Sequence, residues 1–185
     1  RTQIKAINFG LAYGMGPFKL ADTLQISKGE AEALIEKYFT EFPNIRAFLK
    51  KLGTFGTRNA YITTFKPFKR RRWFDNWFPK IWNDRSMFQE FGSIERASKN
   101  TPIQGSSADM TKLALIYIHR EIEESWSDSV KIVMTVHDQI DTICKEEVSE
   151  AWSIKMTELM EKAAKIIIPN GLLKADTNIS AVWQK

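Results

Sequence analysis

Apolar residues recur at helical spacing through the first third of the chain. Residues 1–14 fit one helix, which glycines and a proline bring to an end. Ser27, with Glu30 three positions later, forms a capping box, and the apolar positions behind it predict a helix over 27–39. A shorter helix is predicted over 45–52. This part of the chain is therefore expected to be mostly helical.

The helical pattern fades in the middle of the chain. Residues 61–65 are β-branched or aromatic and predict a strand, whereas 66–92 read as a long, basic and tryptophan-rich loop. A helix is predicted to resume near Ser93 and to stop at Pro102. A second capping box at Ser106 predicts that a new helix begins there.

The last third combines strands with a long helix. Residues 131–136 are apolar and β-branched, and 139–144 alternate polar with apolar side chains, so the two predict a hairpin. Asp138 then lies at its tip. Residues 148–168 predict an amphipathic helix, and a short strand is expected before Trp183. The pattern as a whole predicts an α+β fold.

The composition fits a soluble globular protein. The chain has 185 residues, 43% of them hydrophobic and 26% charged, and no apolar run approaches the ~20 residues of a membrane-spanning helix. No membrane partner is expected. Cys144 is the single cysteine, which fits an intracellular, reducing compartment and excludes an internal disulfide.

The charge favours an anionic partner. Lysine and arginine number 27 against 22 acidic residues, for a formal charge of +5 and a pI near 9.3. Basic and aromatic side chains interleave over 65–73, a pattern that can hold a phosphodiester backbone by charge and stacking. A solvated basic loop explains the same segment equally well.

Four side chains in the first predicted helix follow one another at i+4 spacing. Arg1 and Lys5 are cations suited to phosphate oxygens, and Phe9 and Tyr13 are flat rings suited to stacking. The stripe spans ~18 Å, long enough to meet a triphosphate and its base. An ordinary amphipathic helix packed on a core has the same spacing.

Two further groups carry candidate chemistry. Asp138 can bind Mg²⁺ while phosphates and water complete the octahedron, and His137 beside it can donate to a phosphate; a plain turn is the alternative. Arg96, Asn100 and Gln104 recur at i+4 spacing and can donate to the minor-groove acceptors that every base pair presents. A polar helix face is the alternative there.

Taken in order, these motifs resemble family A DNA polymerases, the DNA polymerase I type. Residues 1–14 (RTQIKAINFGLAYG) resemble the family's motif B, 95–109 (ERASKNTPIQGSSAD) its duplex-contacting segment, and 136–139 (VHDQ) its motif C. The similarity runs almost to the end of the chain, apart from the Trp-rich stretch.

The resemblance implies a role for each site residue. Arg1 and Lys5 would bind the incoming dNTP, with Lys5 near the reacting phosphate and Asp138 as one of two carboxylates holding Mg²⁺. Phe9 would pack on the nucleotide and Tyr13 beside the template base. The duplex near the primer end would be held by Arg96, Asn100, Gln104 and His137. Primer–template DNA and dNTPs are the expected partners.

Two departures limit this resemblance. The family's motif A, which carries the second carboxylate, has no match here, so we expect a further N-terminal portion to supply it. That portion is an omitted region of the same polypeptide, a cleaved piece or a separately encoded chain. Motif C usually has Glu where this chain has Gln139. The resemblance divides the chain into a fingers-like part, 1–93, with a basic insertion near 66–92, and a partial palm, 94–185.

Two other functions remain open at this level. A single-subunit RNA polymerase has a similar helix, in which Arg and Lys precede Tyr-Gly. A non-catalytic nucleic-acid-binding subunit would explain Gln139 as the sign of a decayed site. Retention of Arg1, Lys5 and Asp138 together favours an enzyme.

Overall fold

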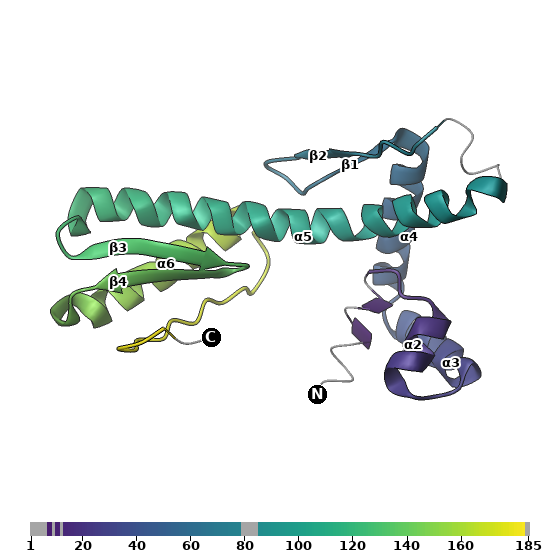
Figure 1. The fold of residues 1–185 in the computed structure, drawn as a ribbon, viewed down its shortest axis with the longest axis horizontal. Helices are drawn as coiled ribbons and strands as arrows, with labels where there is room; N and C mark the ends of the chain where they lie inside the picture. Colours follow the sequence, from purple (N-terminus) through teal and green to yellow (C-terminus); the bar gives the residue numbers. More distant parts are fainter. Residues whose placement is uncertain (1–6, 9, 12, 79–84, 184–185) are drawn as a thin grey trace. The chain divides into compact units, whose positions relative to one another are not determined.

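The computed structural model describes residues 7–8, 10–11, 13–78 and 85–183, and the chain forms two compact units (Figure 1). The first unit contains Arg1–Thr64 and Lys69–Gln104, and the second contains Phe65–Phe68 and Gly105–Lys185. Helices combine with two small antiparallel sheets, which confirms the α+β prediction. The division into fingers-like and palm parts is functional and stays a prediction.

Consecutive helices follow residue 16 in the first unit. They are α2 (Pro17–Leu24), α3 (Lys28–Glu41) and α4 (Pro43–Asn59). The predicted capping box at the start of α3 is confirmed, because the Glu30 backbone N–H donates to Ser27 Oγ at 3.2 Å and the Ser27 N–H donates to Glu30 Oε2 at 2.8 Å. The helix predicted over 45–52 is longer at both ends.

A two-stranded sheet follows α4. Strand β1 (Tyr61–Thr63) pairs antiparallel with β2 (Arg71–Trp73), and Tyr61 lies opposite Trp73. The strand predicted at 61–65 is confirmed in its first residues. The prediction that 66–92 is loop throughout was wrong at β2, because a three-residue strand with two arginines shows no alternating apolar pattern of its own and depends on its partner.

The long helix α5 (Phe88–Glu121) corrects a second prediction. A 3₁₀ turn (Arg85–Met87) leads into it, and it continues without a break through Pro102. An internal proline costs about 3 kcal/mol, and burial offsets that cost because Pro102 shares a fully buried side of the helix with Ile94 and Ser98. Ser106 is consequently not a cap; its hydroxyl accepts the Phe65 backbone N–H at 2.8 Å.

Close approach of α4 and α5 depends on a glycine. A Cβ added at Gly56 would lie 1.7 Å from Ser98 Oγ and 3.2 Å from Phe74 Cε2. Ile62, Phe74 and Ile94 form the buried cluster of this unit. The sheet of the first unit is therefore supported by a small core between α4 and α5.

The second unit places a hairpin against two helices. Strands β3 (Val130–Val136) and β4 (Gln139–Cys144) pair antiparallel, and α6 (Ser149–Ile167) follows a 3₁₀ turn. The hairpin and the long helix are both as predicted. A π-helical turn (Ile122–Trp126) ends α5 ahead of β3.

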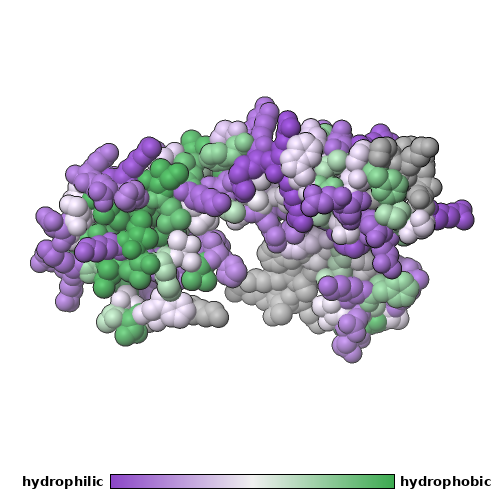
Figure 2. All heavy atoms as spheres, turned by 45° about the horizontal axis from the view of Figure 1, so that its top comes forward, coloured by the Kyte–Doolittle hydropathy of each residue, from purple (hydrophilic) through white to green (hydrophobic). Residues whose placement is uncertain are grey.

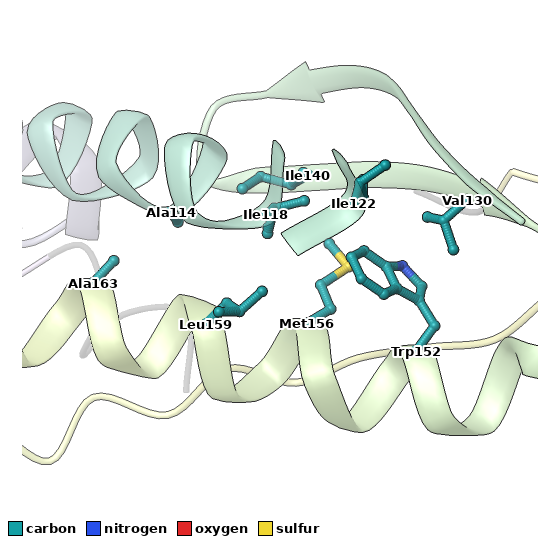
Figure 3. Packing of buried hydrophobic residues seen from close by; sticks show 9 residues of the cluster. All are labelled: Ala114, Ile118, Ile122, Val130, Ile140, Trp152, Met156, Leu159 and Ala163. Carbon is teal, nitrogen blue, oxygen red and sulfur yellow. The ribbon is translucent and has the colours of Figure 1, made fainter. Parts of the chain in front are cut away.

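The core of this unit is shown in Figure 3, where α5 and α6 face one another with the hairpin beside them. Its buried members are Ala114, Ile118, Ile122, Val130, Ile140, Trp152, Met156, Leu159 and Ala163. Hydrophobic surface also gathers over this unit in the space-filling view (Figure 2). The strand predicted before Trp183 was wrong: the described residues 168–183 contain no strand, and a short apolar segment becomes one only beside a partner strand.

No helix in the described part of the chain combines the length and the apolar character that crossing a bilayer requires.

Candidate metal and nucleic-acid site

The tip of the β3–β4 hairpin presents an acidic side chain to solvent. Val136 pairs with Gln139, so His137 and Asp138 form a two-residue turn. His137 has φ 58°, in the left-handed region that such a turn requires. Both side chains are exposed. The predicted position of Asp138 at a hairpin tip is therefore confirmed.

Packing from below holds this hairpin. Val130 at one end and Ile140 near the tip are buried in the core (Figure 3). Trp152 on α6 is 2% exposed and its Nε1–H donates to Thr142 Oγ1 at 2.9 Å. One face of the hairpin is thus fixed on α6, so the tip is carried on a supported element.

Asp141 is a feature of the hairpin that sequence reasoning missed. Gln139 Nε2–H donates to Asp141 Oδ1 at 2.7 Å, and the other carboxylate oxygen is buried without a partner among the described residues. Side chains at i and i+2 of a strand share a face, and this spacing was the available signal. The hairpin thus keeps a negative charge two residues beyond the glutamine, and that charge orients the glutamine.

The hairpin can supply one ligand to a magnesium ion. Carboxylate oxygen is the donor that Mg²⁺ prefers, and an ion held by one or two carboxylates plus phosphates needs no protein cage. Among the described residues no group of three or more His, Cys, Asp or Glu side chains lies close enough to hold a metal. Asp138 is therefore placed where it could act as one carboxylate ligand of such an ion.

Helix α5 carries the polar edge predicted to contact duplex DNA. Arg96 and Gln104 are exposed and Asn100 is half-buried. Asn100 Nδ2–H donates to Gln104 Oε1 at 3.1 Å, so the two amides lie along one edge. Asn100 Oδ1 is buried and has no partner among the described residues. Because its oxygen accepts this bond, the exposed Gln104 keeps its two amide donors for another partner.

The end of the first helix lies beside this edge. Arg1, Lys5 and Phe9 fall outside the described residues, and Tyr13 is half-buried in the turn that closes the helix. Gly14 follows with φ 78°, and a Cβ there would lie 3.1 Å from the Arg96 Cγ. The turn after motif B thus packs on the first residue of the α5 edge, which joins two of the three predicted motifs within one unit.

Comparison with known families decides the chain's membership. The sequence pattern of DNA polymerase family A matches residues 1–185. This chain belongs to DNA polymerase family A. The family assignment confirms the resemblance read from motif B, the α5 segment and motif C.

Curated relatives of this family A chain are bacterial DNA polymerases I. It is 36% identical over 184 residues to DNA polymerase I of Streptococcus pneumoniae and 33% identical over 183 residues to that of Bacillus caldotenax. Each alignment covers 99% of this chain and 20% of the relative. The chain thus spans about a fifth of the length of the curated relatives it matches.

A solved structure agrees with the fold. The family A chain superposes with a TM-score of 0.77 and 31% identity on the polymerase domain of Pol1 from M. smegmatis, solved in complex with DNA primer-template and dNTP. The match covers 88% of this chain and 27% of that one.

Proposed function

We propose that this family A chain takes part in template-directed DNA synthesis, the transfer of a nucleotide from dNTP to a primer 3′-hydroxyl. The observation that carries the proposal is the exposed Asp138 at a two-residue turn, on a hairpin fixed to α6. A structural neighbour that holds DNA primer-template and dNTP supports the choice of substrates.

Asp138 would hold Mg²⁺ together with a second carboxylate. When bound, such ions activate the attacking hydroxyl and stabilise charge on the transferring phosphoryl group. Since the described residues hold no cluster of three ligands, we propose that a further portion carrying motif A contributes the second carboxylate. That portion is the protein partner of this chain, whether linked or separate.

The first helix would bind the nucleotide. Arg1 and Lys5 neutralise triphosphate oxygens, and Lys5 gives a proton to the leaving pyrophosphate. Phe9 packs on the sugar and base. Tyr13 lies beside the template base, next to the turn that Gly14 fits against Arg96.

The α5 edge and His137 would hold the primer–template. Arg96 and the amide donors of Gln104 can reach the minor-groove acceptors common to all base pairs, which checks duplex shape without reading sequence. His137 lies beside Asp138 in the same turn and can donate to the primer backbone.

We also propose the fingers-like role for 1–93 and the palm role for 94–185. An intracellular, reducing compartment suits both a DNA-copying enzyme and the free thiol of Cys144.

Primer extension tests the proposal. The chain is assayed with and without the portion that supplies motif A, on a primed DNA template with Mg²⁺ and either dNTPs or rNTPs. We expect extension with dNTPs when both portions are present, and none after Asp138→Asn. If the two portions together bind DNA but extend no primer, the chain is better explained as a non-catalytic subunit. A preference for rNTPs would favour an RNA polymerase.

A further inference from the structure

One side of the β1–β2 sheet combines an arginine with an exposed tryptophan and a half-buried tyrosine. Arg71 Cζ lies 5.0 Å from the Tyr61 ring centroid and 5.7 Å from that of Trp73. The two rings are 5.1 Å apart and tilted by 50°. We call the side chains of Tyr61, Arg71 and Trp73 the stacking face.

The stacking face points to solvent because strand residues alternate. Arg71 and Trp73 share one side of β2, whereas Ile62 on the other side of the sheet is 3% exposed in the core. Trp73 remains 58% exposed. An exposed ring of this size offers a flat face on which a base can stack, next to a cation that can meet a phosphate.

The two strands and the segment that joins them carry charge of one sign. Residues 61–74 contain five lysines and arginines and no acidic residue. No ion pair joins Lys69, Arg71 or Arg72 to an acidic group within the described ranges. These cations are therefore available to an anionic partner, and Arg71 is already held in place by the two rings, which reduces the entropy lost on binding.

The sheet is also joined to the predicted duplex edge. Arg72, on the opposite side of β2 from the stacking face, donates from Nη1 to Thr101 Oγ1 at 3.1 Å. Thr101 is the residue after Asn100 on α5. The stacking face thus belongs to a strand anchored at the duplex edge, within the same unit.

We propose that the stacking face binds an unpaired DNA strand, with a base stacked on Trp73 and phosphates on Arg71 and Lys69. Bases of a duplex hide their faces in the stack, so aromatic rings select strands that are not paired. An acidic peptide would use the cations but not the rings. The proposal rests on the proposed function in one respect, that the unpaired strand is the template overhang.

Fluorescence anisotropy on the complete polymerase, this chain with the portion that supplies motif A, tests the inference. Affinities are measured over a range of salt for a primed DNA with a long template overhang and for the same duplex with blunt ends. Trp73→Ala should weaken binding of the overhang DNA about five- to a hundred-fold with an unchanged salt slope. Arg71→Ala should also lower the slope of log affinity against log salt by about 0.7.

Matched variants keep the result interpretable. Trp73→Phe retains a ring and should bind overhang DNA nearly as tightly as the wild type. Arg120→Ala removes an exposed arginine of the second unit and should change the affinity for neither DNA. Equal loss on blunt duplex, or wild-type binding by both Trp73→Ala and Arg71→Ala, would overturn the inference. Primer extension on the same samples separates the two proposals. If Trp73→Ala weakens overhang binding but the wild-type protein extends no primer, the binding role of the stacking face is supported and the proposed polymerase function is contradicted.

Discussion

The part of the chain that the structure describes contains two antiparallel hairpins, one that exposes an acidic side chain and one that exposes basic and aromatic side chains. The β3–β4 hairpin turns in two residues, buries Val130 and Ile140, and exposes Asp138. The β1–β2 sheet has three-residue strands joined through 64–70 and exposes Trp73 with Arg71. The β3–β4 hairpin holds a carboxylate on a packed base, and the β1–β2 sheet presents a surface of aromatic rings and cations.

This contrast shows which interactions each site depends on. A metal ligand must be held within a few tenths of an ångström, which requires a packed base under the turn. A surface that receives phosphates and bases works through area and charge, and tolerates adjustment. Substitutions that disturb the packing under the β3–β4 hairpin should therefore lower stability, and substitutions on the β1–β2 sheet should mainly weaken binding.

Two tryptophans give the largest expected difference. Trp152→Ala empties a site that is 2% exposed and removes the N–H that donates to Thr142 Oγ1, so it should lower the free energy of unfolding of the second unit by about 3–5 kcal/mol. Trp73→Ala, at a ring 58% exposed, should cost about 1 kcal/mol or less. Urea unfolding followed by circular dichroism measures both, and equal costs would remove the distinction between the hairpins.

The Gln139–Asp141 pair gives an intermediate effect. Gln139→Glu replaces the donor at 2.7 Å from Asp141 with a second carboxylate, and the repulsion should destabilise the hairpin by about 1–3 kcal/mol at neutral pH without metal. The double variant with Asp141→Asn should recover most of that loss, because one charge is then removed. Urea unfolding in EDTA gives the free energy of unfolding of the wild type, the two single variants and the double variant. If Asp141→Asn restores no stability to the Gln139→Glu protein, the two side chains do not interact as proposed.

The capping box of α3 gives the smallest effect, a pH dependence outside both hairpins. Hydrogen bonds from the Ser27 side chain and backbone lower the pKa of Glu30. Since the folded-state pKa is depressed, the stabilisation is fully present above the ordinary carboxyl pKa and is lost as the pH falls through the lowered value. Glu30→Gln should remove this small stabilisation at neutral pH and flatten the dependence of stability on pH, so that the variant and the wild type become equally stable in the acidic range. An unaltered acid profile would exclude the box as its source.

Local signals predicted the parts of the fold that local interactions determine. The Ser27 box and the β3–β4 turn each depend on neighbours within a few positions, and both were read correctly. Strand β2 and the passage of α5 through Pro102 depend on contacts far along the chain, with β1 and with the core beside α4. Such contacts leave no short-range pattern, which is why a loop and a helix end were predicted there.

The candidate site divides in the same way. Asp138 was placed by the strand pattern and the Asn100–Gln104 edge by helical spacing, and the structure agrees with both positions. Asp141 was missed because an acidic residue inside a strand looks like ordinary surface polarity until Gln139 is seen to donate to it. The roles of these residues stay proposals.

Single-turnover incorporation by the complete polymerase tests the central claim most directly. Asp138→Asn and Asp128→Asn each remove one exposed carboxylate, the first at the hairpin tip and the second in the turn before β3. We predict that Asp138→Asn slows dNMP incorporation roughly a thousand-fold while DNA binding is retained, and that Asp128→Asn leaves the rate unchanged. Equal rates for the two variants would contradict the assignment of Asp138 to the metal site.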